Sequence, residues 1–176
     1  MTESVRWSRT TEHARTGLKG PGAADWLRAR SVPLPLTPNT WVACAGGAGY
    51  IAMLGSNEFF IEAPAPLIDE LDAALANAPA GVYPVLRADA AFVLEGGKVH
   101  DIITQVCNVN FAALDFGPAP IVMTLMIGVA VLILPQASSA GRRYRIWCDP
   151  SFGEYLDHEL SVIVGAVEKE PTGVQS

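Results

Sequence analysis

Between Ala91 and Phe111 the spacing of apolar residues changes from a continuous run to a helical period. The run Ala91–Leu94 is followed by Gly96 and Gly97, and then by four apolar residues at i, i+3, i+4 and i+7: Val99, Ile102, Ile103 and Val106. This spacing places the four on one face of an α-helix. The glycine pair suits a tight turn, because a residue without Cβ tolerates positive φ. The stretch therefore predicts a strand, a turn and a helix.

A similar series of patterns begins about 75 positions earlier, as an alignment of the patterns shows, without a fixed repeat period. Its glycine-rich turn, 17–22, leads into a short helix, as the glycine pair does in the later stretch. In each series three strand-like runs and one amphipathic helix follow. They span 41–45, 49–54, 59–63 and 66–75 in the first series, and 121–125, 128–134, 144–148 and 151–164 in the second.

The repeated order predicts an α+β fold built from two internally duplicated strand–helix–meander–helix units. We expect one domain over 17–167, made of repeats 17–80 and 82–167. Residues 1–16 have little apolar content and predict a flexible N-terminal arm, and 168–176 predict a frayed tail.

Composition narrows the classes of function. Half of the residues are hydrophobic and the formal net charge is −6, with the acidic excess beyond residue 30, so nucleic acid is not an expected partner. Cys44, Cys107 and Cys148 lie far apart and lack zinc-site spacing. They predict buried reduced thiols, no metal site and a cytoplasmic location.

One apolar run is a candidate for a membrane-spanning segment. It covers 121–134 between Pro120 and Pro135, which is shorter than the ~20 residues that a spanning helix needs. Its β-branched content and central Gly128 favour a buried hairpin, and no secretory signal is visible before residue 17. We therefore expect no membrane partner.

Catalytic signals are weak. His100 is adjacent to Asp101 in the predicted helix, but adjacent helical residues point about 100° apart, which favours a solvated histidine. The lone glycine pair at 96–97 lacks a dinucleotide fingerprint and gives little support for a phosphate site at the helix start. Ser151 and Glu154 have the spacing of a helix capping box. No catalytic, cofactor-binding or metal-ligating residue is predicted.

The best candidate for a contact surface is the run Arg142–Trp147. Tyr144, Ile146 and Cys148 alternate with Arg143, Arg145 and Trp147, which predicts one apolar face and one basic, aromatic face. Arginine and tryptophan are frequent at the energetic centres of interfaces. An exposed edge strand protected by charge is an equal alternative. The predicted interface residues, with Trp7 from the arm, are Trp7, Arg142, Arg143, Arg145 and Trp147.

The ordered series resembles the aminomethyltransferase-like fold of the glycine cleavage T-protein family, and most closely the gamma subunits of heterotetrameric sarcosine oxidases and related N-methyl amino acid dehydrogenases. The residues that carry the resemblance are Phe92–Gly97 with the helix 98–106, Cys107–Phe111, Val122–Thr124, Gly128–Leu134 and Tyr144–Cys148 with Ser151–Leu156. A weaker match at Gly20–Ala23 extends it toward the N-terminus.

Departures from the wider family bear on activity. Folate-using members have an arginine-containing turn where this chain reads Leu134–Ala137, and no position here matches their catalytic carboxylate. The Lys-Gly-Cys-Tyr-type motif of the iron–sulfur maintenance proteins is also missing. The resemblance therefore implies the fold without the catalytic apparatus.

What the resemblance implies is a non-catalytic gamma-type subunit of a flavin-dependent N-methyl amino acid oxidase or dehydrogenase coupled to tetrahydrofolate. FAD, FMN, NAD and tetrahydrofolate are then expected in partner subunits: larger flavin-containing alpha and beta subunits, with a small zinc-type delta subunit. A free-standing folate-binding or aminomethyl-transferring protein and an assembly factor remain as alternatives. The sequence leaves the methylated substrate open.

Overall fold

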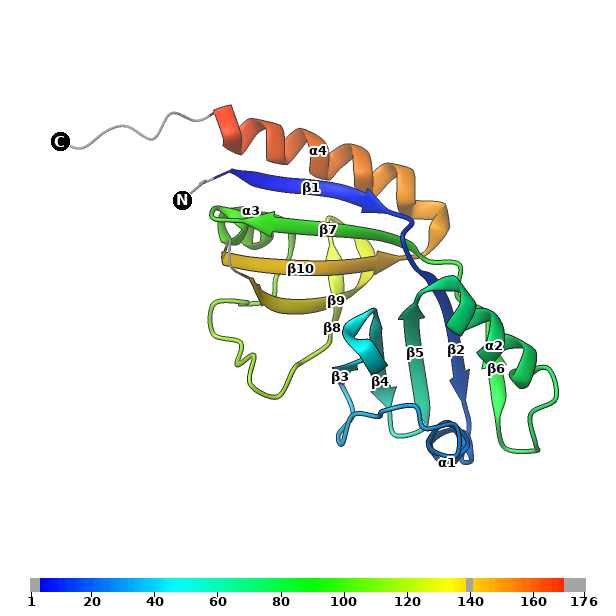
Figure 1. Cartoon of the computed structure of the whole chain (residues 1–176). Helices are drawn as coiled ribbons and strands as arrows, with labels where there is room; N and C mark the ends of the chain where they lie inside the picture. Colours follow the sequence, from blue (N-terminus) through cyan, green and yellow to red (C-terminus); the bar gives the residue numbers. More distant parts are fainter. Residues whose placement is uncertain (1–3, 139–140, 170–176) are drawn as a thin grey trace. The chain divides into compact units, whose positions relative to one another are not determined.

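The computed structural model describes residues 4–138 and 141–169, in which two five-stranded sheets form two compact units. Unit 1 contains the described residues up to Thr10, Ala90–Phe116 and those from Met123 onward. Unit 2 contains Thr11–Asp89 and Gly117–Val122. Figure 1 labels the elements of both.

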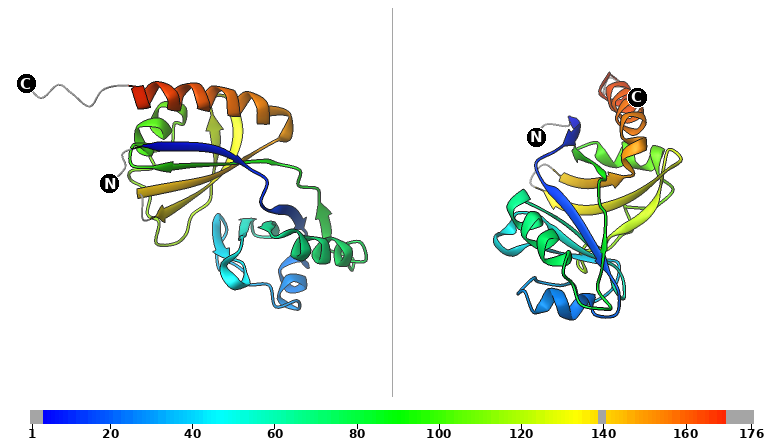
Figure 2. Two further views of the ribbon diagram at one scale, coloured as in Figure 1. Left: turned by 45° about the horizontal axis from the view of Figure 1, so that its top comes forward. Right: turned by 90° about the vertical axis from the view of Figure 1, so that its right-hand side faces the viewer.

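The sheet of unit 1 has the neighbour order β1-β7-β10-β9-β8. Its strands are β1 (Val5–Thr10), β7 (Ala90–Gly96), β8 (Val122–Met126), β9 (Val129–Ser138) and β10 (Gly141–Cys148). The helices of this unit are α3 (Val99–Val106), the short η2 (Pro150–Phe152) and α4 (Gly153–Lys169). Figure 2 shows α4 running alongside β1, and contacts between the two elements agree with this view.

The sheet of unit 2 has the order β3-β4-β5-β2-β6. Its strands are β2 (Ala14–Lys19), β3 (Thr40–Ala43), β4 (Tyr50–Gly55), β5 (Glu58–Ala63) and β6 (Tyr83–Val85). The helices are α1 (Ala23–Arg28), the short η1 (Ala45–Gly47) and α2 (Ala65–Leu75). The core of the unit combines Leu18, Phe59 and Ile61 from the sheet with Leu27 from α1 and Ile68 from α2.

The two units have the same order of elements along the chain. In unit 1, β7 leads through α3 to β8, β9, β10 and α4; in unit 2, β2 leads through α1 to β3, β4, β5 and α2. Each sheet also places its strands in the corresponding neighbour order. The superposition of the two units that a duplication requires stays a prediction.

The structure corrects the prediction of a flexible N-terminal arm. Residues 1–16 were expected to be flexible, yet Val5–Thr10 pairs along its length with β7, and Ala14–Lys19 pairs with β5. The ladder bonds and the burial of Val5 outweigh the low apolar content of the segment. At the other end, α4 extends to Lys169, and the rest of the predicted tail lies outside the described residues.

The run 121–134 forms a hairpin, β8 and β9, with Gly128 at φ +86° in the turn. The expectation that the hairpin is buried is wrong for β8, where Met123 and Leu125 are exposed. Within the described residues, no helix is both long and apolar enough to cross a membrane. The predicted capping box at Ser151 is wrong, because Asp149 is the cap. Its Oδ1 accepts from the Ser151 main-chain N–H at 2.9 Å and from the Ser151 hydroxyl at 2.5 Å, and this lowers the pKa of Asp149.

Candidate functional site

The five predicted contact residues lie on opposite faces of one sheet. β10 pairs with β7 and β9, and its side chains alternate between faces. Trp7 and Tyr144 both pair with Leu94, so Trp7 shares the face of Tyr144, as does Arg142 two residues earlier. Arg143, Arg145 and Trp147 occupy the other face. A single contact surface cannot contain all five.

Arg145 and Trp147 are buried, which corrects the expectation of an exposed basic face. Arg145 is 2% exposed and Trp147 is 1% exposed. Both the contact-surface and the edge-strand interpretations required exposure, but β10 is the central strand of its sheet. The Arg145 guanidinium carbon lies 6.0 Å from the centroid of the Trp147 ring, so part of its environment is aromatic.

Trp7 has partners within unit 1. Its ring stacks on Phe92 at 4.7 Å between centroids and an interplanar angle of 10°, and its Nε1–H donates to Asp157 Oδ1 at 2.8 Å. These contacts hold β1 against both β7 and α4. Trp7 therefore has a structural role in this unit, whatever it contacts in addition.

Arg142 and Arg143 also have partners within unit 1. Arg142 Nη1 donates to the Phe111 carbonyl at 2.7 Å, and its guanidinium lies 5.0 Å from the Phe116 ring. Arg143 Nε lies 3.6 Å from Glu95 Oε2, with 36% of its side chain exposed. Burial raises the pKa of the neighbouring Tyr144 hydroxyl, an effect that the charge of Arg142 opposes.

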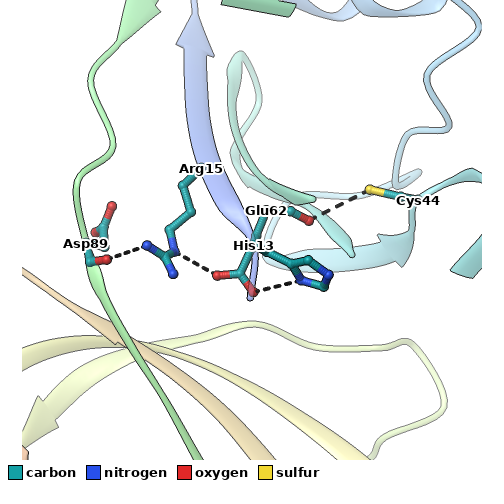
Figure 3. Close-up of polar contacts among 5 residues, drawn as sticks. All are labelled: His13, Arg15, Cys44, Glu62 and Asp89. Carbon is teal, nitrogen blue, oxygen red and sulfur yellow. Dashed lines mark hydrogen bonds and ion pairs between the residues drawn. The ribbon is translucent and has the colours of Figure 1, made fainter. Parts of the chain in front are cut away.

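A buried polar cluster lies in unit 2, around Glu62 on β5 (Figure 3). The Glu62 side chain is 0% exposed; its Oε2 accepts from Arg15 Nε at 2.7 Å, and its Oε1 lies 3.8 Å from His13 Nδ1. Arg15 Nη1 also donates to the Asp89 carbonyl at 2.7 Å. The guanidinium thus joins the central strands of the sheet to the segment that leaves β6.

Cys44 borders this cluster but is not an activated nucleophile. Its Sγ lies 3.9 Å from the Glu62 main-chain carbonyl. Burial, followed by the charge of Glu62, raises the pKa of the thiol from 9.0 to about 11. A reactive cysteine needs a lowered pKa, so this thiol stays protonated at neutral pH. The three cysteines are buried, as predicted, and none of them forms a disulfide.

Sequence reasoning missed the cluster, although β5 contained a signal. Glu62 is the single charged residue inside the apolar run Phe59–Ala63. A carboxylate in such a run requires a partner when the strand is buried. The identity of that partner was not accessible, because Arg15 is 47 positions away in the sequence.

Other candidate groups are not brought together. His100 is the second residue of α3, and Asp101 beside it is exposed. Among the side chains described in 4–138 and 141–167, no three or more histidine, cysteine, aspartate or glutamate groups lie close enough to hold a metal ion.

The two antiparallel sheets with their helices form an α+β fold. Among solved structures, a chain of heterotetrameric sarcosine oxidase from Corynebacterium sp. U-96, in complex with pyrrole 2-carboxylate, matches with a TM-score of 0.71 and 22% identity, over 99% of this chain and 90% of that chain. The aminomethyltransferase T of the glycine cleavage system from Bartonella henselae matches with a TM-score of 0.68 and 14% identity, over 89% of this chain.

These matches confirm the resemblance predicted from the sequence, at the level of fold. The chain spans 45% of the length of the aminomethyltransferase. No family model and no curated protein matches the sequence.

Proposed function

We propose that this chain is a non-catalytic, gamma-type subunit of a multi-subunit, flavin-dependent N-methyl amino acid oxidase or dehydrogenase of the sarcosine type, coupled to one-carbon transfer to tetrahydrofolate. FAD, FMN, NAD and tetrahydrofolate are bound by its partners, which are larger alpha and beta subunits and a small zinc-type delta subunit. This chain supports the assembly.

The observation that carries the proposal is the extent of the two structural matches. The chain covers nearly all of a chain of sarcosine oxidase but less than half of the aminomethyltransferase. The match therefore extends over most of one chain of the first protein and over less than half of the second. Because fold alone does not imply activity, the proposal needs the chemistry of the site as independent support.

The polar groups of unit 2 support a structural role. A general base must reach a substrate proton by a hydrogen bond. Glu62 is fully buried and pairs with Arg15, and the Cys44 thiol is held protonated. The Arg15–Glu62 pair joins β2 to β5 and stabilises the sheet, which supports a structural role for this cluster.

Co-expression of this chain with flavoprotein subunits of the proposed complex tests the proposal. A tag on this chain is expected to recover a complex with the absorbance of bound flavin and with sarcosine- or N-methylglutamate-oxidising activity. Omission of this chain should lower the yield of active complex. A chain that remains monomeric, beside a complex that is complete without it, would refute the proposal.

A free-standing folate-binding protein is the second candidate, favoured by the likeness to aminomethyltransferase T. A calorimetric titration of the isolated chain with tetrahydrofolate distinguishes the two candidate functions. Micromolar binding by the chain alone supports this candidate, whereas no binding is expected for the subunit. An assembly factor would instead associate transiently and be absent from the final complex.

A further inference from the structure

The sheet of unit 2 has an incomplete edge. β6 is the outer strand, and its ladder with β2 covers only three pairs: Gly17–Val85, Leu18–Pro84 and Lys19–Tyr83. β2 begins three residues before Gly17, at Ala14. The first half of β2 therefore extends beyond the strand that flanks it (Figure 1).

Pro84 fixes the direction of the unpaired main-chain groups. Proline has no N–H, so Leu18–Pro84 is a non-hydrogen-bonded pair, and Gly17 and Lys19 turn their N–H and C=O groups toward β6. Gly20 points to the opposite side, toward β5, because its main-chain N–H donates to the Asn57 carbonyl at 2.9 Å. By the same alternation, Arg15 turns its main-chain N–H and C=O groups to the side where β6 has ended.

A groove of about 450 Å³ lies at this place. Its walls come from the first half of β2, from the C-terminal part of α2 and from the segment that follows β6. The lining residues are Arg15, Thr16, Asp72, Leu75, Ala76, Pro84, Val85, Leu86 and Arg87. The volume is in the range of ligand-binding clefts, and most of the lining is apolar.

Leu86 is an exposed, large apolar residue of this lining. It is 93% exposed, and it follows directly on the last residue of β6. A large apolar side chain in this position, next to an unfinished strand edge, gives an incoming segment a hydrophobic contact beside the main-chain groups of Arg15.

Two guanidinium groups add donors. Arg15 donates from Nε to Glu62 and from Nη1 to the Asp89 carbonyl. Arg87 donates from Nη2 to Glu58 Oε1 at 3.2 Å. Each guanidinium therefore retains its second Nη group for a further acceptor. The Asp72 carboxylate accepts from the Thr16 hydroxyl. The unused donors favour an acidic side chain on the occupant.

We propose that this groove binds an extended segment of a partner flavoprotein subunit, which pairs with the free edge of β2, contacts Leu86 and places an acidic residue against Arg15 and Arg87. The inference rests on the proposed function. Addition of a strand to an open sheet edge is an established way for one protein to bind another.

Two equally exposed leucines of unit 2 provide a matched test. Leu36 is 98% exposed and is not part of the groove. The affinity of the full chain for the co-expressed flavoprotein subunits is measured by biolayer interferometry for the wild type, Leu86→Asp and Leu36→Asp. We expect Leu86→Asp to weaken binding at least tenfold and Leu36→Asp to change it less than twofold. Arg87→Gln should weaken it about tenfold and reduce its dependence on salt.

The outcomes separate the two proposals. If the wild type binds and Leu86→Asp and Arg87→Gln bind equally well, the groove inference is overturned and the proposed function stands. If the wild type does not bind, both are overturned. Thermal unfolding of each variant verifies that a loss of binding does not reflect a loss of fold, and a photo-crosslinking residue at position 86, but not at 36, should attach to a partner peptide.

Discussion

The central strands of the two sheets each bury a charged side chain, but in different surroundings. β10, between β7 and β9, buries Arg145, whereas β5, between β4 and β2, buries Glu62. Glu62 has a guanidinium at 2.7 Å; Arg145 pairs in register with Val93 and Leu134 and lies near an aromatic ring. The comparison teaches that the position of a strand in its sheet, and not the charge of its residues, decided burial here.

The strongest test of this comparison removes the Glu62 charge. Glu62→Gln leaves the Arg15 guanidinium buried without its carboxylate, and we expect a loss of about 3–5 kcal/mol in the free energy of unfolding, measured in urea. Glu58→Gln is the matched control, because its pair with Arg87 is partly exposed and should contribute no more than about 1 kcal/mol. Equal losses for the two variants would contradict the distinction.

The double variant Arg15→Met, Glu62→Leu sharpens the same point. Replacement of both members of a buried ion pair by apolar residues is often neutral or stabilising. We therefore expect the double variant to be more stable than Glu62→Gln in the same urea series. A double variant as unstable as the single one would show that the other contacts of the cluster dominate.

Adjacent arginines on β10 provide the next test. Arg145→Ala removes a buried side chain, and we expect a loss of about 2–4 kcal/mol from lost packing. Arg143→Ala, at a partly exposed position, should lose about 0.5 kcal/mol. Urea unfolding of both variants measures the difference. The reverse order would restore the interpretation of an exposed basic face.

Trp7 tests whether β1 belongs to the folded sheet. Trp7→Ala removes the stacking on Phe92 and the bond to Asp157, and we expect a loss of about 2–3 kcal/mol, below that of a fully buried tryptophan. Trp7→Phe keeps an aromatic ring but loses the hydrogen bond to Asp157, and it should lower the free energy of unfolding by about 1 kcal/mol. No change for Trp7→Ala in thermal unfolding would support the flexible arm.

Cys44 gives a smaller effect that depends on pH. Its folded pKa is raised, so its contribution to stability is complete below pH 9 and decreases as the pH rises toward about 11. The difference between the ordinary pKa of 9.0 and the folded pKa of about 11 corresponds to a loss of about 2 kcal/mol in the free energy of unfolding by pH 11. Urea unfolding between pH 8 and 11 should show a smaller alkaline loss for Cys44→Ala than for the wild type. Parallel curves would contradict the raised pKa.

Local patterns predicted most elements and missed their environment. The period of Val99, Ile102, Ile103 and Val106 gave α3, and the alternation in 144–148 gave β10, because both depend on neighbours in sequence. The burial of Arg145 and the pairing of Arg15 with Glu62 depend on the order of strands in a sheet. The pairing of Val5–Thr10 with β7 joins segments more than 80 residues apart, which no local pattern contains.

The mass and composition of the assembly that contains this chain test the central claim most directly. Native mass spectrometry of the complex recovered through a tag on the full chain should give one defined mass, with this chain in fixed stoichiometry with flavin-bearing subunits. Recovery of the chain as a monomer under the same conditions, while the flavin-bearing subunits assemble to full activity without it, would contradict the account.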